Sequence, residues 1–222
     1  MEGTITALKA QKRDKNRVSV YLDGEYAFGL TRIVAAWLSI GQVLSAEKIA
    51  ELRAQDSRET AHQQALRLLN YRDRSESEVR QRLGQKQVPE EIITEVVERL
   101  HRSGLIDDKR FAQTWIDNRA EFHPRSRRAL AYELRGKGID PQAIQDALDP
   151  FDEDEAAYAA ARKYAQKLKQ MEWPVFRQKM IGFLARRGFA YETANTALTR
   201  VWAERNGENA SKDTPISEEV DL

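Results

Sequence analysis

The sequence predicts a mainly α-helical protein, with three tandem three-helix repeats in an elongated, curved array. A small N-terminal β meander and a connecting helix are expected to precede them. Three observations predict this fold. One pattern of apolar residues occurs three times at a period of about 50 residues, which is typical of a helical array. Residues 18–28 instead alternate apolar and polar side chains, as strands do. Cysteine is absent, which excludes a disulfide framework, a thiolate zinc site and a cysteine nucleophile.

Residues 1–55 are predicted to form the meander and its helix. An alternating strand pattern ends at Leu22, and a second one follows Asp23 and Gly24. An Asp-Gly pair between two such runs favours a hairpin because both residues tolerate positive φ. Residues 5–10 are the expected third strand. Such a small sheet is marginal alone, so the helix that Ser45 is expected to cap should pack on it.

The repeats are predicted to occupy residues 56–106, 107–153 and 154–205. Leu83, Leu134 and Leu184 hold equivalent positions in them, and each is followed by a short turn and a second amphipathic stretch. Gly138 and Gly188 come four residues after the second and third leucine, where a left-handed residue often ends a helix. Another amphipathic stretch precedes each leucine. Each repeat should therefore contain three helices.

Charge is unevenly distributed along the chain. The whole sequence has 36 basic and 35 acidic residues. Residues 206–222 have five acids and one base, so residues 1–205 carry a net charge of +5. We predict that residues 206–222 form an acidic, disordered tail, because they contain few apolar side chains. The mildly basic remainder is weak evidence for a nucleic-acid partner, because affinity depends on clustering rather than on the sum.

The chain shows no signal for secretion or membrane insertion. The first 15 residues contain no apolar run, and the longest apolar run, residues 33–38, is far below the ~20 residues of a membrane span. Together with the absence of cysteine, this is compatible with a soluble cytoplasmic protein. We expect no membrane partner.

An enzymatic function is not expected. His62, His101 and His123 have neither the spacing of metal ligands nor that of a catalytic triad. Asp107 and Asp108 fit a helix cap better than an acid–base pair. No G-x-x-x-x-G-K-[ST] motif for binding phosphates is present. We therefore predict a non-enzyme without a metal or cofactor.

Basic residues recur at corresponding positions of the repeats and are the candidate sites for an anionic partner. They are Arg80, Arg82, Lys86, Arg125, Arg127, Arg128, Arg135, Lys137, Arg177, Lys179, Arg186 and Arg187. The three arginines within residues 125–128 lie at a predicted helix start, where the helix dipole disfavours cations, so a partner explains them better. Lys86, Lys137 and Arg187 lie near predicted helix ends, where a cation stabilises the helix itself, and both explanations remain open.

Several segments together resemble a known family. They are R-x-R-S-E-x-E-V-R-x-R-L at residues 72–83, G-L-I-D-D-x-R-F-A at residues 104–112, E-L-R-x-K-G-I at residues 133–139 and the leader VYLDGEYAFGL at residues 20–30. In combination they are similar to the bacterial RecX regulators of the RecA recombinase, over nearly all of residues 4–200. The resemblance implies a cytoplasmic, non-enzymatic modulator that binds RecA filaments on DNA and limits their growth or activity.

Two hypotheses follow. In the first, the chain is a RecX-like regulator that docks along the groove of a RecA filament on single-stranded DNA. Whether it also contacts single- or double-stranded DNA directly stays open. In the second, it is a stand-alone DNA-binding protein whose three-helix units act as helix-turn-helix readers, which predicts tight DNA binding without RecA. No dimerisation element is evident, so a monomer is expected.

Overall fold

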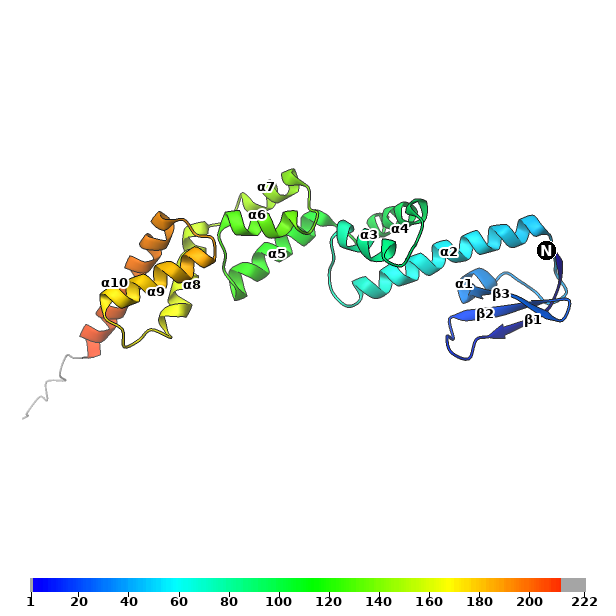
Figure 1. Cartoon of the computed structure of the whole chain (residues 1–222), viewed down its shortest axis with the longest axis horizontal. Helices are drawn as coiled ribbons and strands as arrows, with labels where there is room; N and C mark the ends of the chain where they lie inside the picture. The colour runs from blue at the N-terminus through cyan, green and yellow to red at the C-terminus, as the bar shows by residue number, and fades with distance from the viewer. Residues whose placement is uncertain (1, 213–222) are drawn as a thin grey trace, which may run out of the picture. The chain divides into compact units, whose positions relative to one another are not determined.

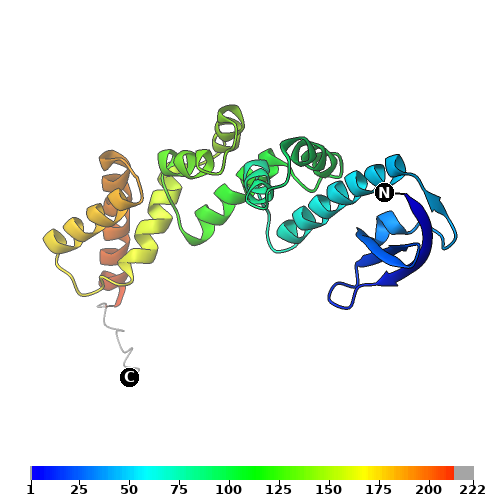
Figure 2. The ribbon, with the colours of Figure 1, turned by 45° about the vertical axis from the view of Figure 1, so that its right-hand side comes forward.

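The computed structural model describes residues 2–212, with side chains to residue 206 (Figures 1 and 2). The chain divides into two compact units, Met1–Asp107 and Asp108–Leu222. The first contains a small sheet and the first three-helix domain. The second contains the other two three-helix domains.

The N-terminal sheet is antiparallel, with its strands in the order β3-β2-β1-β4. The strands are β1 (Gly3–Ala10), β2 (Arg17–Leu22), β3 (Glu25–Thr31) and β4 (Val43–Leu44). The predicted hairpin between β2 and β3 is confirmed, with positive φ at both Asp23 and Gly24. The predicted three-stranded meander gains a fourth, two-residue strand, because β4 pairs with the start of β1 at Gly3 and Thr4.

One long helix connects the sheet to the first three-helix domain. After the short helix α1 (Arg32–Ala35), helix α2 runs without a break over Ala46–Leu69. It begins as predicted at Ser45, whose Oγ accepts a hydrogen bond from the Lys48 amide at 3.2 Å. Ile49 and Leu52 belong to the core of the sheet, whereas Ala61 and Ala65 belong to the core of the following domain. Helix α2 therefore crosses the predicted boundary between residues 55 and 56 and serves both cores.

The first three-helix domain consists of the second half of α2, α3 (Glu76–Gly84) and α4 (Glu90–Arg102). Leu83, which the repeat pattern marks, is fully buried here together with Val79 and Leu100. Ser75 is also buried, and its Oγ accepts a hydrogen bond from the Glu78 amide at the start of α3. This N-cap satisfies one of the amide donors that a helix start leaves unpaired.

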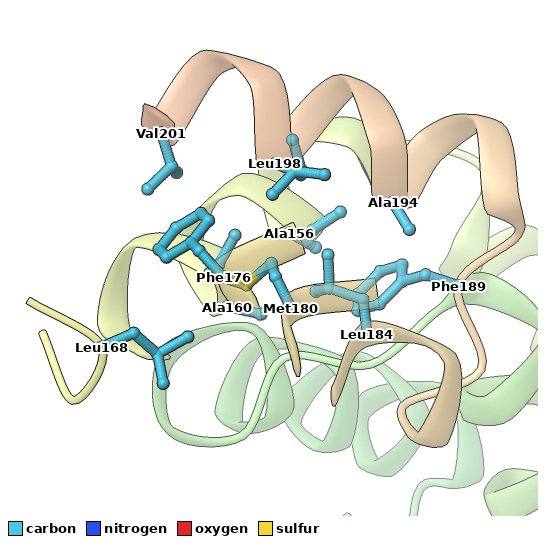
Figure 3. Close-up of a cluster of buried hydrophobic side chains, with 13 residues drawn as sticks. Ala156, Ala160, Leu168, Phe176, Met180, Leu184, Phe189, Ala194, Leu198 and Val201 are labelled. Carbon is cyan, nitrogen blue, oxygen red and sulfur yellow. The ribbon is translucent and has the colours of Figure 1, made fainter. Parts of the chain in front are cut away.

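The second unit contains two further domains of the same kind. The second three-helix domain consists of α5 (Asp108–Phe122), α6 (Arg127–Arg135) and α7 (Pro141–Leu148). The third consists of α8 (Glu153–Ala165), α9 (Trp173–Arg186) and α10 (Tyr191–Lys212). Leu134 and Leu184 are fully buried in their respective cores, and Figure 3 shows Leu184 beside Met180 and Phe189 in the third. The predicted fold class is thus confirmed: a mainly helical chain with three three-helix domains after a small sheet.

The turns between paired helices follow one plan. Gly138 and Gly188 have φ of 75° and 93°, as predicted for residues that end a helix in the left-handed conformation. In the first domain the equivalent residue is Gln87, which adopts φ of 60° although it has a side chain. Each turn also directs the chain into the next helix, which starts directly after Pro89 in the first domain and at Pro141 in the second.

The last helix extends into the segment that the sequence predicts to be a disordered tail. The backbone of α10 stays helical to Lys212, past residue 206, where the sequence predicts disorder to begin. The rest of that predicted tail, residues 213–222, lies outside the described residues. Within the part that the structure describes, no helix is long and apolar enough to cross a membrane.

Candidate basic interface

The three candidate bases of the first unit lie on α3 and in the turn after it. Arg80 is engaged within its own domain: its Nε lies 2.6 Å from Glu76, and its Nη1 lies 3.0 Å from Glu90. Arg82 donates a hydrogen bond to Gln85 at 3.1 Å. Lys86 is exposed. Two carboxylates therefore balance the charge of Arg80, and an added anionic partner would compete with them.

The arginines at the start of α6 have different surroundings. Arg127 donates a 2.6 Å hydrogen bond to the carbonyl oxygen of Phe151, which follows α7. Arg125 lies 3.0 Å from Glu133 without the alignment of a hydrogen bond, while Arg128 is exposed. The helix dipole disfavours all three, but intramolecular acceptors compensate Arg125 and Arg127. Arg128 is the member of this group that faces solvent.

The remaining candidate bases lie at the end of α6, in the turn after it, and along and just after α9. Lys137 places its Nζ 5.1 Å from the centre of the Trp115 ring, and Arg177 donates a 2.7 Å hydrogen bond to the Tyr191 hydroxyl. Arg135 and Lys179 are exposed. Arg186 and Arg187 end helix α9 and lead to the joint with the second three-helix domain.

Hydrogen bonds to backbone carbonyl oxygens join the loop before α6 to the turn after α9. The Ser126 amide donates to the carbonyl oxygen of Arg187 at 3.1 Å, and Arg187 Nη1 donates to the carbonyl oxygen of Pro124 at 2.8 Å. A Cβ atom on Gly188 would lie only 2.5 Å from Ser126 Oγ, so glycine is needed for this close approach as well as for its positive φ. The loop before α6 and the turn after α9 are thus fitted to each other.

A hollow of about 450 Å³ lies beside this joint. Its lining residues, here called the basic hollow, are Arg119, His123, Arg125, Phe183, Arg186 and Arg187. The structure therefore brings together three of the predicted residues, which come from segments about 60 residues apart. Sequence reasoning did not assign Arg119, His123 and Phe183 to a site. Arg119 belongs to the same basic stretch of sequence as Arg125, which is the signal that points to it, whereas His123 and Phe183 have no sequence signal for a site.

The basic hollow has an excess of positive charge. Among its arginines, Arg119 and Arg125 share the single carboxylate of Glu133, at 2.8 and 3.0 Å. Within residues 2–206, neither Arg186 nor Arg187 forms an ion pair with an acid. Burial lowers the pKa of Arg187, and the nearby charge of Arg125 lowers it further. This unfavourable environment for cations is one that a bound anion would improve.

An aromatic hollow of about 230 Å³ adjoins the basic hollow and shares His123, Phe183 and Arg187 with it. Its further lining residues are Phe122, Pro124, Ala160, Lys163, Tyr164 and Lys167. The rings of Tyr164 and Phe183 stack with their centres 4.0 Å apart and their planes 7° from parallel. The Phe122 side chain at the end of α5 is about half exposed.

A third hollow, of about 470 Å³, has the opposite charge. It lies between α5, α7 and α8 and is lined by Asp117, Asp152 and Glu155, and no basic side chain is among its described lining residues. These two hollows of the second unit are therefore opposite in charge.

Comparisons with known proteins agree with this domain plan. The family model described as the regulatory protein RecX N-terminal domain matches residues 3–45. Models of the first, second and third three-helix domains of RecX match residues 61–100, 107–148 and 152–198. The chain belongs to the RecX family. This confirms the family that the sequence motifs indicate.

RecX proteins of other bacteria are similar along most of their length. "Regulatory protein RecX" of Bacillus velezensis is 32% identical over 209 residues, which cover 92% of this chain and 80% of that protein. Its namesake from Bacillus licheniformis is 32% identical over 224 residues, covering 94% and 85% of the two chains. A crystal structure of regulatory protein RecX, 28% identical, superimposes with a TM-score of 0.65 over 86% of this chain and 97% of that chain.

Proposed function

We propose that this RecX-family chain binds RecA filaments on single-stranded DNA and inhibits their extension, ATP hydrolysis and recombinase activity. The observation that carries the proposal is the match of all four RecX models, in order, along one chain. RecA is the partner that the resemblance to the RecX regulators implies, and the motifs at residues 72–83 and 104–112 are part of that resemblance. The protein is proposed to act as a monomer, without catalysis, in the cytoplasm, where filaments on bacterial DNA are located.

Exposed bases of the second unit supply the proposed contacts. Arg128, Arg135, Lys179 and Arg186 are all exposed, and none forms an ion pair within residues 2–206. Such side chains suit acidic filament surface and phosphate, because their attraction acts over the Debye length and needs little desolvation. Several modest contacts on linked domains add up to useful affinity, since each successive contact forms at high effective concentration.

The alternative of a stand-alone helix-turn-helix reader is less well supported. A recognition helix presents its first residues to the major groove of DNA. The helices that follow the turns here begin with acids: Glu90 and Glu91 at α4, Asp140 before α7 and Glu192 at α10. These carboxylates would face the negative potential of the groove. We therefore retain the filament as the proposed partner.

The decisive experiment titrates the protein into RecA during DNA-dependent ATP hydrolysis. We expect inhibition at far below one molecule per RecA, with weak binding to duplex DNA alone. Arg128→Glu combined with Arg135→Glu should raise the concentration for half-inhibition several-fold at low salt, and its difference from the unaltered protein should shrink as salt screens the attraction. Arg127 is left unchanged because its bond to Phe151 is structural. Lys169→Glu, which reverses one exposed charge in the α8–α9 loop, serves as the control for each of the two reversals made singly.

Two outcomes would contradict the proposal. An unchanged rate of ATP hydrolysis at equimolar protein would exclude RecA as the target. Equal inhibition by the double variant, the control and the unaltered protein at every salt concentration would exclude the exposed arginines as the contact, while leaving the family assignment intact.

A further inference from the structure

We propose that the basic hollow and the adjoining aromatic hollow form one binding site for a short segment of single-stranded nucleic acid, with its phosphates at the arginines and a base at the aromatic side chains. The site lies entirely within the second unit. It goes beyond the proposed function because it requires no RecA.

Continuity between the hollows is the first argument. His123, Phe183 and Arg187 line both of them, so a ligand that enters one reaches the other without leaving the surface. The combined lining places charged groups at one end and flat rings at the other. A nucleotide fits this arrangement because its charged phosphate can bind the charged groups and its flat base can stack on the rings.

Charge is the second argument. Four guanidinium groups line the basic hollow, and Glu133 is the one carboxylate that pairs with them among the described residues. Lys163 and Lys167 add two further cations at the aromatic hollow. Folding brings these charges together at a cost, because Arg187 is half-buried beside Arg125. A phosphate would offset that cost, and guanidinium groups bind phosphate with two parallel hydrogen bonds.

Ring geometry favours a single strand over a duplex. Tyr164 and Phe183 form a parallel stack, and the Arg187 guanidinium lies 4.5 Å from the Phe183 ring centre. Beside this group, Phe122 keeps 48% of its surface exposed. Exposed rings and guanidinium planes bind the faces of unstacked bases, which a duplex hides between its base pairs. An acidic peptide would bind the arginines, but its side chains carry no flat base that would stack on the rings.

The test measures direct binding of the full chain to a fluorescein-labelled oligothymidylate of about 15 nucleotides, without RecA, by anisotropy at several salt concentrations. Contact with about three phosphates predicts a slope of log affinity against log salt near −2. The same oligomer paired into a duplex should bind at least several-fold more weakly. Unlabelled thymidine monophosphate should compete poorly, because it offers a single phosphate and a single base.

Three variants locate the site. Arg186→Ala should weaken binding and reduce the salt slope by about 0.7, the value for one phosphate contact on a single strand. Phe122→Ala should weaken binding about tenfold with the slope unchanged, since it removes a ring on which one base stacks and leaves every cation in place. Lys169→Ala removes an exposed base outside both hollows and should bind like the unaltered protein. Circular dichroism verifies that each variant is folded.

Any of three results would overturn the inference. They are equal binding by the Arg186→Ala and Lys169→Ala variants, duplex affinity equal to or above single-strand affinity, and polyglutamate competing as well as unlabelled oligothymidylate does. The inference and the proposed function fail separately. Inhibition of RecA by a protein that binds no oligothymidylate would reject this site alone, whereas binding without any effect on RecA would reject the proposed function alone.

Discussion

Gln87 holds a position that glycine holds in the other two repeats. All three residues end a helix with positive φ, but only Gln87 has a Cβ atom to strain there. A left-handed conformation costs a residue with a side chain about 1–2 kcal/mol. The first three-helix domain therefore contains a small, local destabilisation that its sequence alone would not reveal.

We expect Gln87→Gly to raise the free energy of unfolding of the first unit by about 0.5–1 kcal/mol, because strain relief exceeds the entropy that glycine adds to the unfolded chain. Gln85→Gly is the matched control. Gln85 is right-handed at φ −59°, so glycine brings no relief there and should destabilise. Urea denaturation of both variants measures the difference. If the two substitutions destabilised the protein equally, the backbone at Gln87 would not be strained.

His62 predicts a pH dependence. It is buried on α2, and its Nδ1 has no hydrogen-bond partner within the described residues. Burial lowers its pKa, as does the charge of Arg99, while Glu59 acts in the opposite direction. The folded protein therefore holds this proton less tightly than the unfolded chain, in which the pKa is about 6.5.

It follows that His62 costs stability as the pH falls below about 6.5, because the unfolded chain then takes up the proton first. His62→Gln should reduce the fall in unfolding free energy between pH 7.5 and 5.5, by at most about 1.4 kcal/mol per pH unit. Urea denaturation at several pH values measures this slope. An identical slope in the two proteins would show that His62 does not contribute.

Helix α2 shows how an element depends on contacts beyond its own sequence. Asp56, in the middle of this helix, accepts hydrogen bonds from the Thr31 amide and from Arg17, which lies on β2 and is 2.9 Å away. Arg17 also donates to the carbonyl oxygen of Gly29 at 3.0 Å. One carboxylate thus ties the helix to two strands.

Asp56→Ala should lower the free energy of unfolding of the first unit by about 2–3 kcal/mol, because it leaves the partly buried Arg17 guanidinium without its carboxylate partner and the Thr31 amide without its acceptor. Glu51→Ala on the same helix is the control. Glu51 pairs with Lys48 at 2.8 Å, but both side chains are about half exposed, so the loss should stay below about 0.5 kcal/mol. Hydrogen exchange at the amides of β2 and β3 measures both effects. Equal protection in the two variants would contradict a special role for Asp56.

Element boundaries were only partly predictable. The glycines after α6 and α9 and the cap at Ser45 mark their helix ends because these signals are local. The two-residue strand β4 has no such signal, since it exists only where β1 offers hydrogen-bonding groups. The predicted division at residue 55 fell within α2 because nothing in that stretch breaks a helix, and the change of core from Leu52 to Ala61 occurs along one continuous element.

At the scale of the whole molecule, the two compact units contain separate hydrophobic cores. Fragments 1–107 and 108–212 should therefore each fold alone and unfold cooperatively, since about 100 residues suffice for an independent core. Circular dichroism during urea denaturation checks this for each fragment. A fragment without a cooperative transition would show that its core needs the other unit.

The sequence by itself determined the family, the three-helix plan and the ends of several helices, because these depend on periodicity and on capping groups that are neighbours along the chain. Only the tertiary structure decided which bases lie together in one hollow. Arg125 and Arg187 are far apart in sequence, and they meet because Gly188 lets two loops approach closely. Arg80 and Arg127 instead bind acceptors within their own domains. Charge patterns identify candidate residues, but the folded chain determines which charges remain uncompensated.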